Sequence, residues 1–442
     1  MSVTPLLLPV SARQLLMVCH RLDTPALLYC GTSGSTHTGE QRRRIILACQ
    51  PDEQVCAHQP AELQSLILRF QHHSGPTTES VFRSGWLGYF SYDAGELLMG
   101  LDNRPGARAP LAEFGYYPLT LELYPDSDEC WLWNPQQHPQ TRVEQLLNHL
   151  QQTLNTALPL ADSSATDAII ADDWQPAWSY PRYQQAFNRV QEYLRSGDAY
   201  QVNLTMPYYS QTDLRDRNPL ALLEHFDAPF SGYFRTPTLT LFSVSPERFI
   251  RIENDRMTTS PIKGTAPRHP DPTTDHQNRE WLRNSTKNQA ENLMIVDLLR
   301  NDLGMCAQTG SVKVEKLFAI ESHANVHHMV STIVARVLPR LRAIDVIVSA
   351  LPGGSITGAP KRRSMEIIQE LEADRRGLYC GSFGYVDDSG TTDFNILIRS
   401  IQAYANGASC WAGGGVVIDS DAAGEYQEIQ DKIGRLLGIS RL

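Results

Sequence analysis

The sequence lacks several features that would point to particular classes of protein. Its 442 residues carry a formal net charge of -10, so it has no excess of basic residues of the kind that binds nucleic acid or anionic membranes. No apolar run approaches the length of a membrane span. The first ten residues have no basic start and contain two prolines, which is unlike a signal peptide. This composition favours a small substrate as the partner.

Metal-binding and nucleotide-binding motifs are also absent. The eight cysteines are scattered without a CxxC pair, which is unlike a zinc or redox site and predicts reduced thiols in a cytoplasmic protein. The glycine-rich residues 352–361 form neither a Walker A loop nor GxGxxG, so a nucleotide phosphate is not predicted there. They precede a predicted helix, whose free N–H groups favour a carboxylate. A plain glycine-rich turn is the simpler alternative.

The chain is predicted to contain two regions. A polar, Ser/Thr-containing segment at 159–173 resembles a linker, and it separates a sheet-rich N-terminal subdomain, 1–165, from a region that carries the chemistry, 166–442. Apolar periodicity predicts helices over 61–70, 180–196, 286–301 and 422–437. The proline-containing residues 266–278 are predicted to be mobile surface.

Lys263 is interpreted as a nucleophile in a short loop. It stands between Ile262 and Gly264, and on these residues alone an ordinary surface lysine is the commoner explanation. Upstream, alternating residues predict a strand over 238–245, and Pro246 ends it so that Glu247 lies at its tip. A second strand, 248–252, leads towards the lysine. An acid and an amine are therefore expected near the ends of neighbouring strands.

Carboxylates lie on the apolar faces of two predicted helices. Glu291 falls on the apolar stripe of the helix at 286–301, where it needs a partner, either a core arginine or a metal ion. On the last helix, Glu425, Glu428 and Lys432 share a face, and two glutamates three residues apart can reach one cation. Oxygen ligands without a nearby histidine or thiolate suit Mg²⁺, although a solvated acidic face is the commoner explanation.

Three further features suggest a binding site. Gly413, Gly414 and Gly415 interrupt a predicted strand, which weakens its pairing unless something must approach the backbone closely. Arg399 offers a fork suited to a carboxylate, with a surface ion pair as the alternative. His327 and His328 are predicted to point to opposite faces of a strand, so at most one of them faces a site.

Five motifs in the family's order carry a resemblance to the chorismate-utilising enzymes. They are residues 245–247, 261–265, 290–297, 353–361, and 412–417 followed by Glu425 and Glu428. The chain is most similar to the branch that makes 4-amino-4-deoxychorismate from chorismate and ammonia, for p-aminobenzoate and folate. The resemblance covers 180–442 and, more weakly, the N-terminal half. It implies an α+β fold in which two large antiparallel sheets pack as a sandwich with helices outside, and it makes 166–442 the chorismate-binding catalytic region.

The resemblance also implies residue roles. Lys263 would attack C2 of chorismate while the C4 hydroxyl leaves with a proton from Glu247, and ammonia would then attack C4 and expel the lysine. An unperturbed lysine has a pKa of about 10.4, so the pKa of a nucleophilic one must be lowered. The other implied roles are His328 in catalysis, substrate binding by Tyr379, Arg399, Gly413, Gly414, Gly415, Ser355 and Thr265, and Mg²⁺ binding by Glu291 and Glu428 with Glu425 as an auxiliary ligand.

The resemblance implies a partner protein, and the chain also differs from the family's usual pattern at some positions. The chain has no Gly-x-Cys-x-Gly motif, so a separate glutamine amidotransferase subunit would supply ammonia. Asn288 and Gln289 replace the Asp-Arg of many relatives, which is expected to loosen support for Glu291. Cys30 replaces the serine of the Leu-Leu-x-Ser motif in tryptophan-sensing relatives, which speaks against tryptophan binding.

Three other readings remain open. The anthranilate-forming branch shares nearly all these motifs but typically has alanine where this chain has Lys263, and the isochorismate-forming branch is a further rival. A non-catalytic chorismate or tryptophan binder is the alternative of another class. The presence of Lys263, Glu247 and all the carboxylates argues against that last reading.

Overall fold

The computed structural model describes residues 5–29, 43–70, 81–102, 104–161, 173–322 and 326–437, without the side chains of 158–161. The predicted boundary between 165 and 166, most of the predicted linker, and Cys30 lie outside these residues. Within them, no helix is both long and apolar enough to cross a membrane.

The larger of two sheets has twelve strands. In spatial order they are β1 (Leu6–Leu8), β8 (Glu129–Trp133), β7 (Thr120–Tyr124), β3 (Ile45–Ala48), β2 (Ala26–Tyr29), β11 (Ser231–Arg235), β12 (Thr240–Ser243), β21 (Ser400–Tyr404), β22 (Gly407–Val416), β10 (Gln201–Ser210) and β18 (Gly358–Ala359), with β9 (Gln175–Pro176) paired to β10. Neighbouring strands run antiparallel, as in the long β10–β22 ladder from Val202↔Val416 to Ser210↔Ala408.

The second sheet has ten strands and is also antiparallel. Its order is β15 (Ile262–Pro267), β17 (Val326–Arg336), β14 (Arg256–Thr259), β13 (Arg248–Glu253), β20 (Thr392–Asn395), β19 (Ser382–Asp387), β5 (Gly85–Phe90), β6 (Ala112–Tyr117) and β4 (Glu53–Ala57), with β16 (Lys313–Ser322) paired to β17.

The two sheets pack face to face through an apolar core of their own. Ile46, Phe234 and Leu241 from the larger sheet join Leu87 and Phe383 from the second in one buried cluster. The approach is so close that a Cβ on Gly232 would lie 2.3 Å from the ring of Phe383. The sandwich expected from the family resemblance is confirmed.

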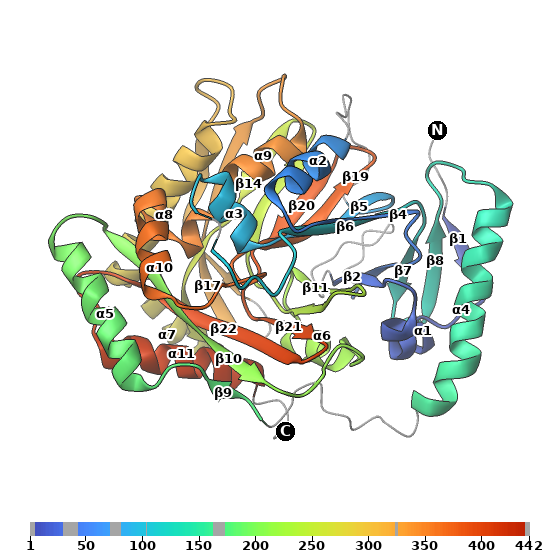
Figure 1. Cartoon of the computed structure of the whole chain (residues 1–442), viewed down its shortest axis with the longest axis horizontal. Helices are drawn as coiled ribbons and strands as arrows, with labels where there is room; N and C mark the ends of the chain where they lie inside the picture. The colour runs from blue at the N-terminus through green and yellow to red at the C-terminus, as the bar shows by residue number, and fades with distance from the viewer. Residues whose placement is uncertain are drawn as a thin grey trace.

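Helices cover the outer faces of both sheets (Figure 1). α4 lies at the β1–β8 end of the larger sheet, and α5, α10 and α11 lie near its other end. The second sheet packs on α2, α3, α8 and α9. The helices are α1 (Ala12–Val18), α2 (Pro60–Arg69), α3 (Tyr92–Leu98), α4 (Gln140–Ala161), α5 (Tyr180–Arg195), α6 (Leu220–Phe226), α7 (Pro272–Arg283), α8 (Thr286–Gly304), α9 (Ala343–Ala350), α10 (Lys361–Leu371) and α11 (Ala422–Leu437), with short 3₁₀ turns η1 (Cys19–Arg21) and η2 (Gly354–Ile356).

Each sheet combines strands from both sides of the predicted boundary. β2 pairs with β11 in the larger sheet, and β5 pairs with β19 in the second. The division at 165 and 166 remains a prediction about the chain, while the N-terminal strands lie inside the same sandwich as the later ones.

One local prediction is refined and one is wrong. Most of residues 266–278 are exposed, as predicted for surface, but the segment also contains regular structure, because α7 begins at Pro272 with Asp271 as its N-cap. Proline is favoured in the first turn of a helix, where its missing N–H has no partner to lose. Lys263 lies on the edge strand β15 and not in a loop.

Candidate active site

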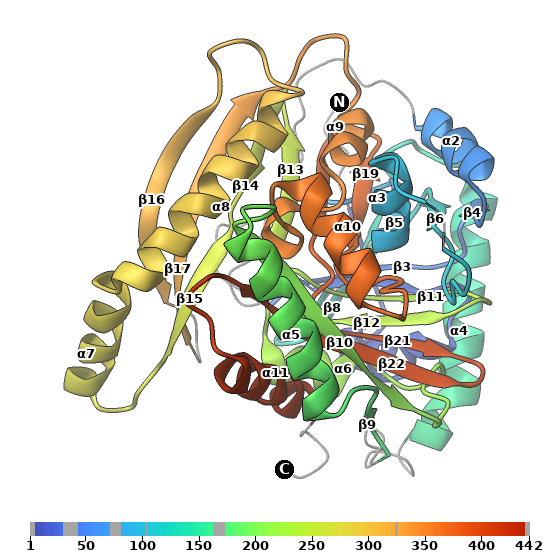
Figure 2. The same cartoon turned by 60° about the vertical axis from the view of Figure 1, so that its left-hand side comes forward.

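Lys263 is positioned by a break in the pairing of β15 with β17. Ile262 pairs with Val330 and Thr265 with His328, and the register shifts between them. Gly264 takes a φ of +88° there, as expected for a glycine in a bulge. A Cβ on Gly264 would lie 2.7 Å from Cγ of Asn288, so α8 packs directly on this bulge. Figure 2 shows α8 alongside β15 and β17.

The ammonium of Lys263 lies among charges from several elements. Burial lowers its pKa, and the carboxylates of Glu247, Glu291 and Glu428 oppose that shift, while the ammonium of Lys432 adds to it. The lowered pKa increases the neutral fraction that can act as a nucleophile. The structure thus brings the predicted amine to the predicted acid and to two of the predicted metal ligands.

Glu247 is buried, with 7% of its surface exposed, and it holds a defined position. Ser355 Oγ donates a hydrogen bond to its Oε1 at 2.9 Å, and its backbone carbonyl accepts one from the N–H of Ile396. Burial raises the pKa of Glu247, against the opposing effects of Lys263, Ser355 and Arg399. A raised pKa is what a general acid needs in order to keep its proton near neutral pH.

Arg399 also interacts electrostatically with the Glu247 carboxylate. Its φ of +51° is unusual for a residue with a side chain and turns the chain just before β21. Burial and the neighbouring Arg435 lower the pKa of Arg399, and Glu247 opposes them. Two guanidinium groups close to each other favour the binding of an anionic ligand.

The three glycines lie on β22 opposite Thr205, Leu204 and Asn203 of β10. A Cβ on Gly414 would lie 2.7 Å from Oε2 of Glu425, so the missing side chain admits that carboxylate from α11. A Cβ on Gly415 would similarly meet the amide of Gln201. Close packing against these neighbours thus explains why side chains are missing at these positions. The role of the three glycines in substrate binding remains a prediction.

The predicted metal ligands approach one another but do not form a preassembled site. Glu428 Oε1 pairs with Lys432 Nζ at 2.7 Å, and Glu291 Oε1 lies 3.9 Å from Lys287 Nζ. Burial and the adjacent Glu428 raise the pKa of Glu425, while Ser420 donates to it. Across the described residues, no three Asp, Glu, His or Cys side chains are arranged to hold a metal ion.

The remaining predicted residues lie around this centre in different ways. His328 is buried with Nδ1 3.1 Å from Thr265 Oγ1, and the two residues are paired across β15 and β17. His327 instead contacts Ser322 and Asp275, so the expectation that the two histidines face opposite sides is confirmed. The ring of Tyr379 is buried and stacks on that of Trp411, with centroids 6.0 Å apart.

Lys432 is the main residue whose contribution sequence reasoning missed. Its ammonium pairs with Glu428, donates to the carbonyl of Gly413 at 2.8 Å and lowers the pKa of Lys263. Its spacing of four residues from Glu428 was visible in the sequence, but the contact with Gly413 depends on how α11 packs against β22.

Comparison with known proteins assigns the chain to a family. The family described as chorismate binding enzyme matches residues 27–438. Aminodeoxychorismate synthase component 1 of Escherichia coli K12 is 42% identical over 378 residues, covering 85% of this chain and 81% of the relative. Its counterpart in Salmonella typhimurium LT2 is 40% identical over 390 residues, with the same shares covered.

Solved structures share the fold. Anthranilate synthase component I of Streptococcus pneumoniae superposes with a TM-score of 0.75 at 26% identity, covering 89% of this chain and 92% of that one. The isochorismate synthase MenF of Escherichia coli gives a TM-score of 0.69 at 17% identity, covering 98% and 93%, which indicates the fold alone. By the family match and the identity to these relatives, the chain belongs to the chorismate binding enzymes.

Proposed function

We propose that the chain is component 1 of an aminodeoxychorismate synthase and converts chorismate and ammonia to 4-amino-4-deoxychorismate, for p-aminobenzoate and folate. The observation that carries the proposal is that the amine of Lys263, whose pKa is lowered, and the carboxyl of Glu247, whose pKa is raised, lie close enough to influence each other electrostatically. The names of the relatives from Escherichia coli and Salmonella typhimurium support the same reaction.

The reaction follows from these two groups. The neutral amine of Lys263 forms a bond to C2 of chorismate as both conjugated ring double bonds shift and the C4–O bond breaks. Glu247 gives its proton to the departing oxygen, which leaves as water, because hydroxide alone is a poor leaving group. Ammonia then bonds to C4, both double bonds return to their original positions, and the C2–N bond to Lys263 breaks, which frees the lysine amine. Arg399 and Tyr379 bind the enolpyruvyl carboxylate, and Ser355 orients Glu247.

Magnesium fits the chemistry of the acidic side chains. Glu291, Glu425 and Glu428 offer only oxygen ligands, and the effect of Glu428 on the pKa of Glu425 reflects a repulsion that a divalent cation would relieve. When bound, Mg²⁺ would neutralise and hold the ring carboxylate of chorismate. Lys432 Nζ lies 2.7 Å from Oε1 of Glu428, so a bound ion would compete with this ammonium for the Glu428 carboxylate.

The ammonia source is a separate glutamine amidotransferase subunit. The chain has no Gly-x-Cys-x-Gly motif, and Cys380, which lies between Tyr379 and Gly381, is buried with a pKa raised by that burial to about 12. A thiol held in its neutral form is a poor nucleophile for glutamine. The numbering of the relatives as component 1 is consistent with a two-subunit enzyme.

Product identification tests this proposal. The purified chain is supplied with chorismate, Mg²⁺ and ammonium chloride, and separately with glutamine, with and without an added glutaminase subunit. We expect 4-amino-4-deoxychorismate from ammonium, and from glutamine only when the glutaminase is present. Release of anthranilate and pyruvate would assign the chain to the anthranilate branch instead.

A further inference from the structure

A buried ion pair lies behind the turn that carries Ser355. Arg376, with no exposed surface, donates from Nε and Nη2 to the two carboxylate oxygens of Glu372, both at 2.8 Å. The guanidinium also lies 4.6 Å from the ring centroid of Tyr92. A buried bidentate pair with further hydrogen bonds fixes geometry more strictly than apolar packing does.

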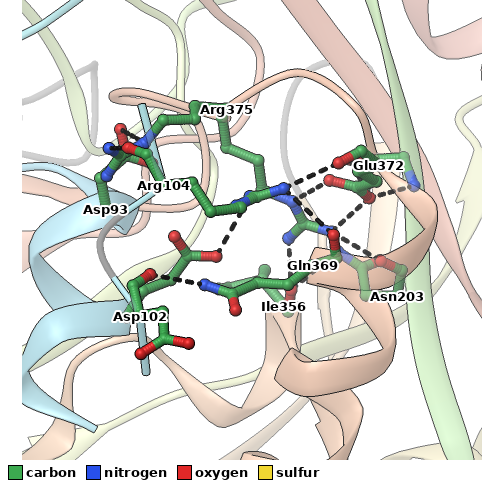
Figure 3. Close-up of polar contacts among 11 residues, drawn as sticks. Asp93, Asp102, Arg104, Asn203, Ile356, Gln369, Glu372 and Arg375 are labelled. Carbon is green, nitrogen blue, oxygen red and sulfur yellow. Dashed lines mark hydrogen bonds and ion pairs between the residues drawn. The ribbon is translucent and has the colours of Figure 1, made fainter. Parts of the chain in front are cut away.

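The pair reaches the active-site turn through backbone carbonyls. Arg376 donates to the carbonyl of Ile356 at 3.2 Å and to that of Asn203 at 2.7 Å. The side-chain amide of Asn203 donates to the same Ile356 carbonyl at 2.8 Å. Figure 3 shows Glu372, Asn203 and Ile356 joined in this way. Because Ile356 follows Ser355, these bonds fix the residue that donates to Glu247.

Glu372 also connects the Arg376–Glu372 pair to β10, the strand that pairs with the three glycines of β22. Its Oε1 accepts hydrogen bonds from the backbone N–H and the hydroxyl of Thr205, at 2.9 and 2.8 Å. Thr205 stands opposite Gly413, whose carbonyl accepts from Lys432. One ion pair therefore sets the position of η2 and of β10 relative to each other.

We propose that Arg376 is a positioning residue for the Ser355–Glu247 pair. Through the Ile356 carbonyl it holds the Ser355 hydroxyl where it can orient the Glu247 carboxyl towards the departing oxygen. The inference rests on the proposed role of Glu247 as general acid. The other end of the turn is held separately, by Asp302, which accepts from the N–H of Gly354. Loss of the Arg376 bonds should therefore loosen the Ile356 end without unfolding the turn.

The neighbouring Arg375 provides a matched control. Its side chain is also buried and charged, but its Nε lies 3.0 Å from Asp93 Oδ2 on α3, and Nη1 donates to the carbonyl of Arg104. Figure 3 shows Arg375 and Asp93 on the opposite side of the network from Glu372 and Asn203. If the fold simply needs a buried arginine at each position, substitution of either arginine should lower activity. If Arg376 positions Ser355, only substitution of Arg376 should do so.

A double-mutant cycle tests the inference. Arg376→Lys, Arg375→Lys and Ser355→Ala are made singly, and each arginine variant is combined with Ser355→Ala. The kcat and KM for chorismate are measured with ammonium as nitrogen source, together with Tm. We expect Arg376→Lys to lower kcat on the order of tenfold with little change in KM, since a small displacement of a catalytic group has effects of this size. Arg375→Lys should leave kcat within about twofold.

The coupling to Ser355 decides the outcome. In the Ser355→Ala background, Arg376→Lys should cause no further fall in kcat, because the hydroxyl that it positions is gone. An equal fall in both backgrounds would overturn the inference, as would equal losses of kcat in the two arginine variants. If Arg376→Lys does not fold, Asn203→Ala removes only the amide bond to Ile356, and the same loss of effect in the Ser355→Ala background is expected.

The product is identified in the same reactions, with rates taken from chorismate consumption. Anthranilate from the unaltered chain would refute the proposed function, while the cycle would still report whether Arg376 is coupled to Ser355. Independent effects of Arg376 and Ser355, with aminodeoxychorismate as product, would refute the positioning role alone.

Discussion

Lys263 and Glu247 owe their shifted pKa values to the same physical cause. Burial disfavours the charged form of each, which lowers the pKa of the lysine and raises that of the glutamate. Their mutual attraction opposes both shifts. The pKa values of this amine and this acid are therefore closer together than those of an unperturbed lysine and glutamate. This suits a reaction that needs the neutral form of both groups.

The hydrogen bond from Ser355 should be visible in the pH dependence of the reaction. That bond stabilises the charged form of Glu247, so Ser355→Ala should raise the pKa of Glu247 further and let it keep its proton to higher pH. The variant will be slower overall, but its kcat/KM relative to the unaltered enzyme should increase from acid to alkaline pH. Measurement of kcat/KM between pH 5 and 9 checks this.

Ser196→Ala, at an exposed hydroxyl after α5, is the matched control and should give a ratio that does not change with pH. A pH-independent ratio for Ser355→Ala as well would remove the Ser355 bond as an influence on the acid.

At the scale of elements, two helices bring carboxylates close enough to Lys263 to affect its pKa. α8 supplies Glu291 and packs Asn288 against the bulge at Gly264, and α11 supplies Glu425 and Glu428 beside β22. Figure 2 shows α11 beside α5. The expectation that Asn288 loosens support for Glu291 is not tested, but the Asn288 side chain is held, because its Nδ2 donates to Ser285 Oγ at 3.0 Å.

Removal of these charges should raise the metal requirement. We expect Glu291→Gln and Glu428→Gln each to increase the Mg²⁺ concentration that gives half-maximal activity, by about tenfold or more, since an amide is a weaker ligand than a carboxylate. A titration of activity with MgCl₂ gives the value for each variant.

Glu192→Gln, on the exposed face of α5, is the control and should titrate like the unaltered enzyme. If the midpoints of Glu291→Gln and Glu428→Gln also stay unchanged, neither residue is a ligand.

Sequence patterns were most informative where structure is local. The apolar spacing around Glu291 and Glu428 predicted α8 and α11, because helix periodicity depends on residues within a few turns. The strand character of Lys263 was missed, because it comes from pairing with β17 more than sixty residues later. The contact of Gly414 with Glu425 likewise depends on packing between elements, which no local pattern contains.

At the scale of the whole molecule, a buried network of charges connects α3 with the region after α10. Arg375 pairs with Asp93, and Arg104 Nη2 lies 3.4 Å from Oε1 of Glu96. Burial and then the proximity of Asp93 raise the pKa of Glu96 to about 7, and burial raises that of Asp93 to about 6, against the effects of the arginines. These carboxyls make the stability of the fold depend on pH.

Stability should therefore fall as the pH rises. Between pH 4.5, the ordinary pKa of a glutamate, and about pH 7, the raised pKa of folded Glu96, the folded protein keeps a proton that the unfolded chain has lost. This contribution to stability is therefore full below pH 4.5 and lost above about pH 7. The shift corresponds to about 3 kcal/mol of unfolding free energy. Glu96→Gln cannot ionise and should lose less stability between pH 5 and pH 8 in urea denaturation.

Glu144→Gln, at an exposed position on α4, should follow the unaltered protein. The same decline for Glu96→Gln as for the unaltered protein would show that the Glu96 carboxyl does not titrate in this range.

The central claim, that Lys263 is the nucleophile, is tested most directly by mass spectrometry of peptides from the enzyme. The enzyme is mixed with chorismate and Mg²⁺ in the absence of ammonia, quenched and digested. We predict an added mass of chorismate less one water, located on Lys263, and none on Lys263→Ala, which should still bind chorismate but form no aminodeoxychorismate. Undiminished synthesis by Lys263→Ala, or no adduct on an enzyme that turns over once ammonia is added, would contradict the account.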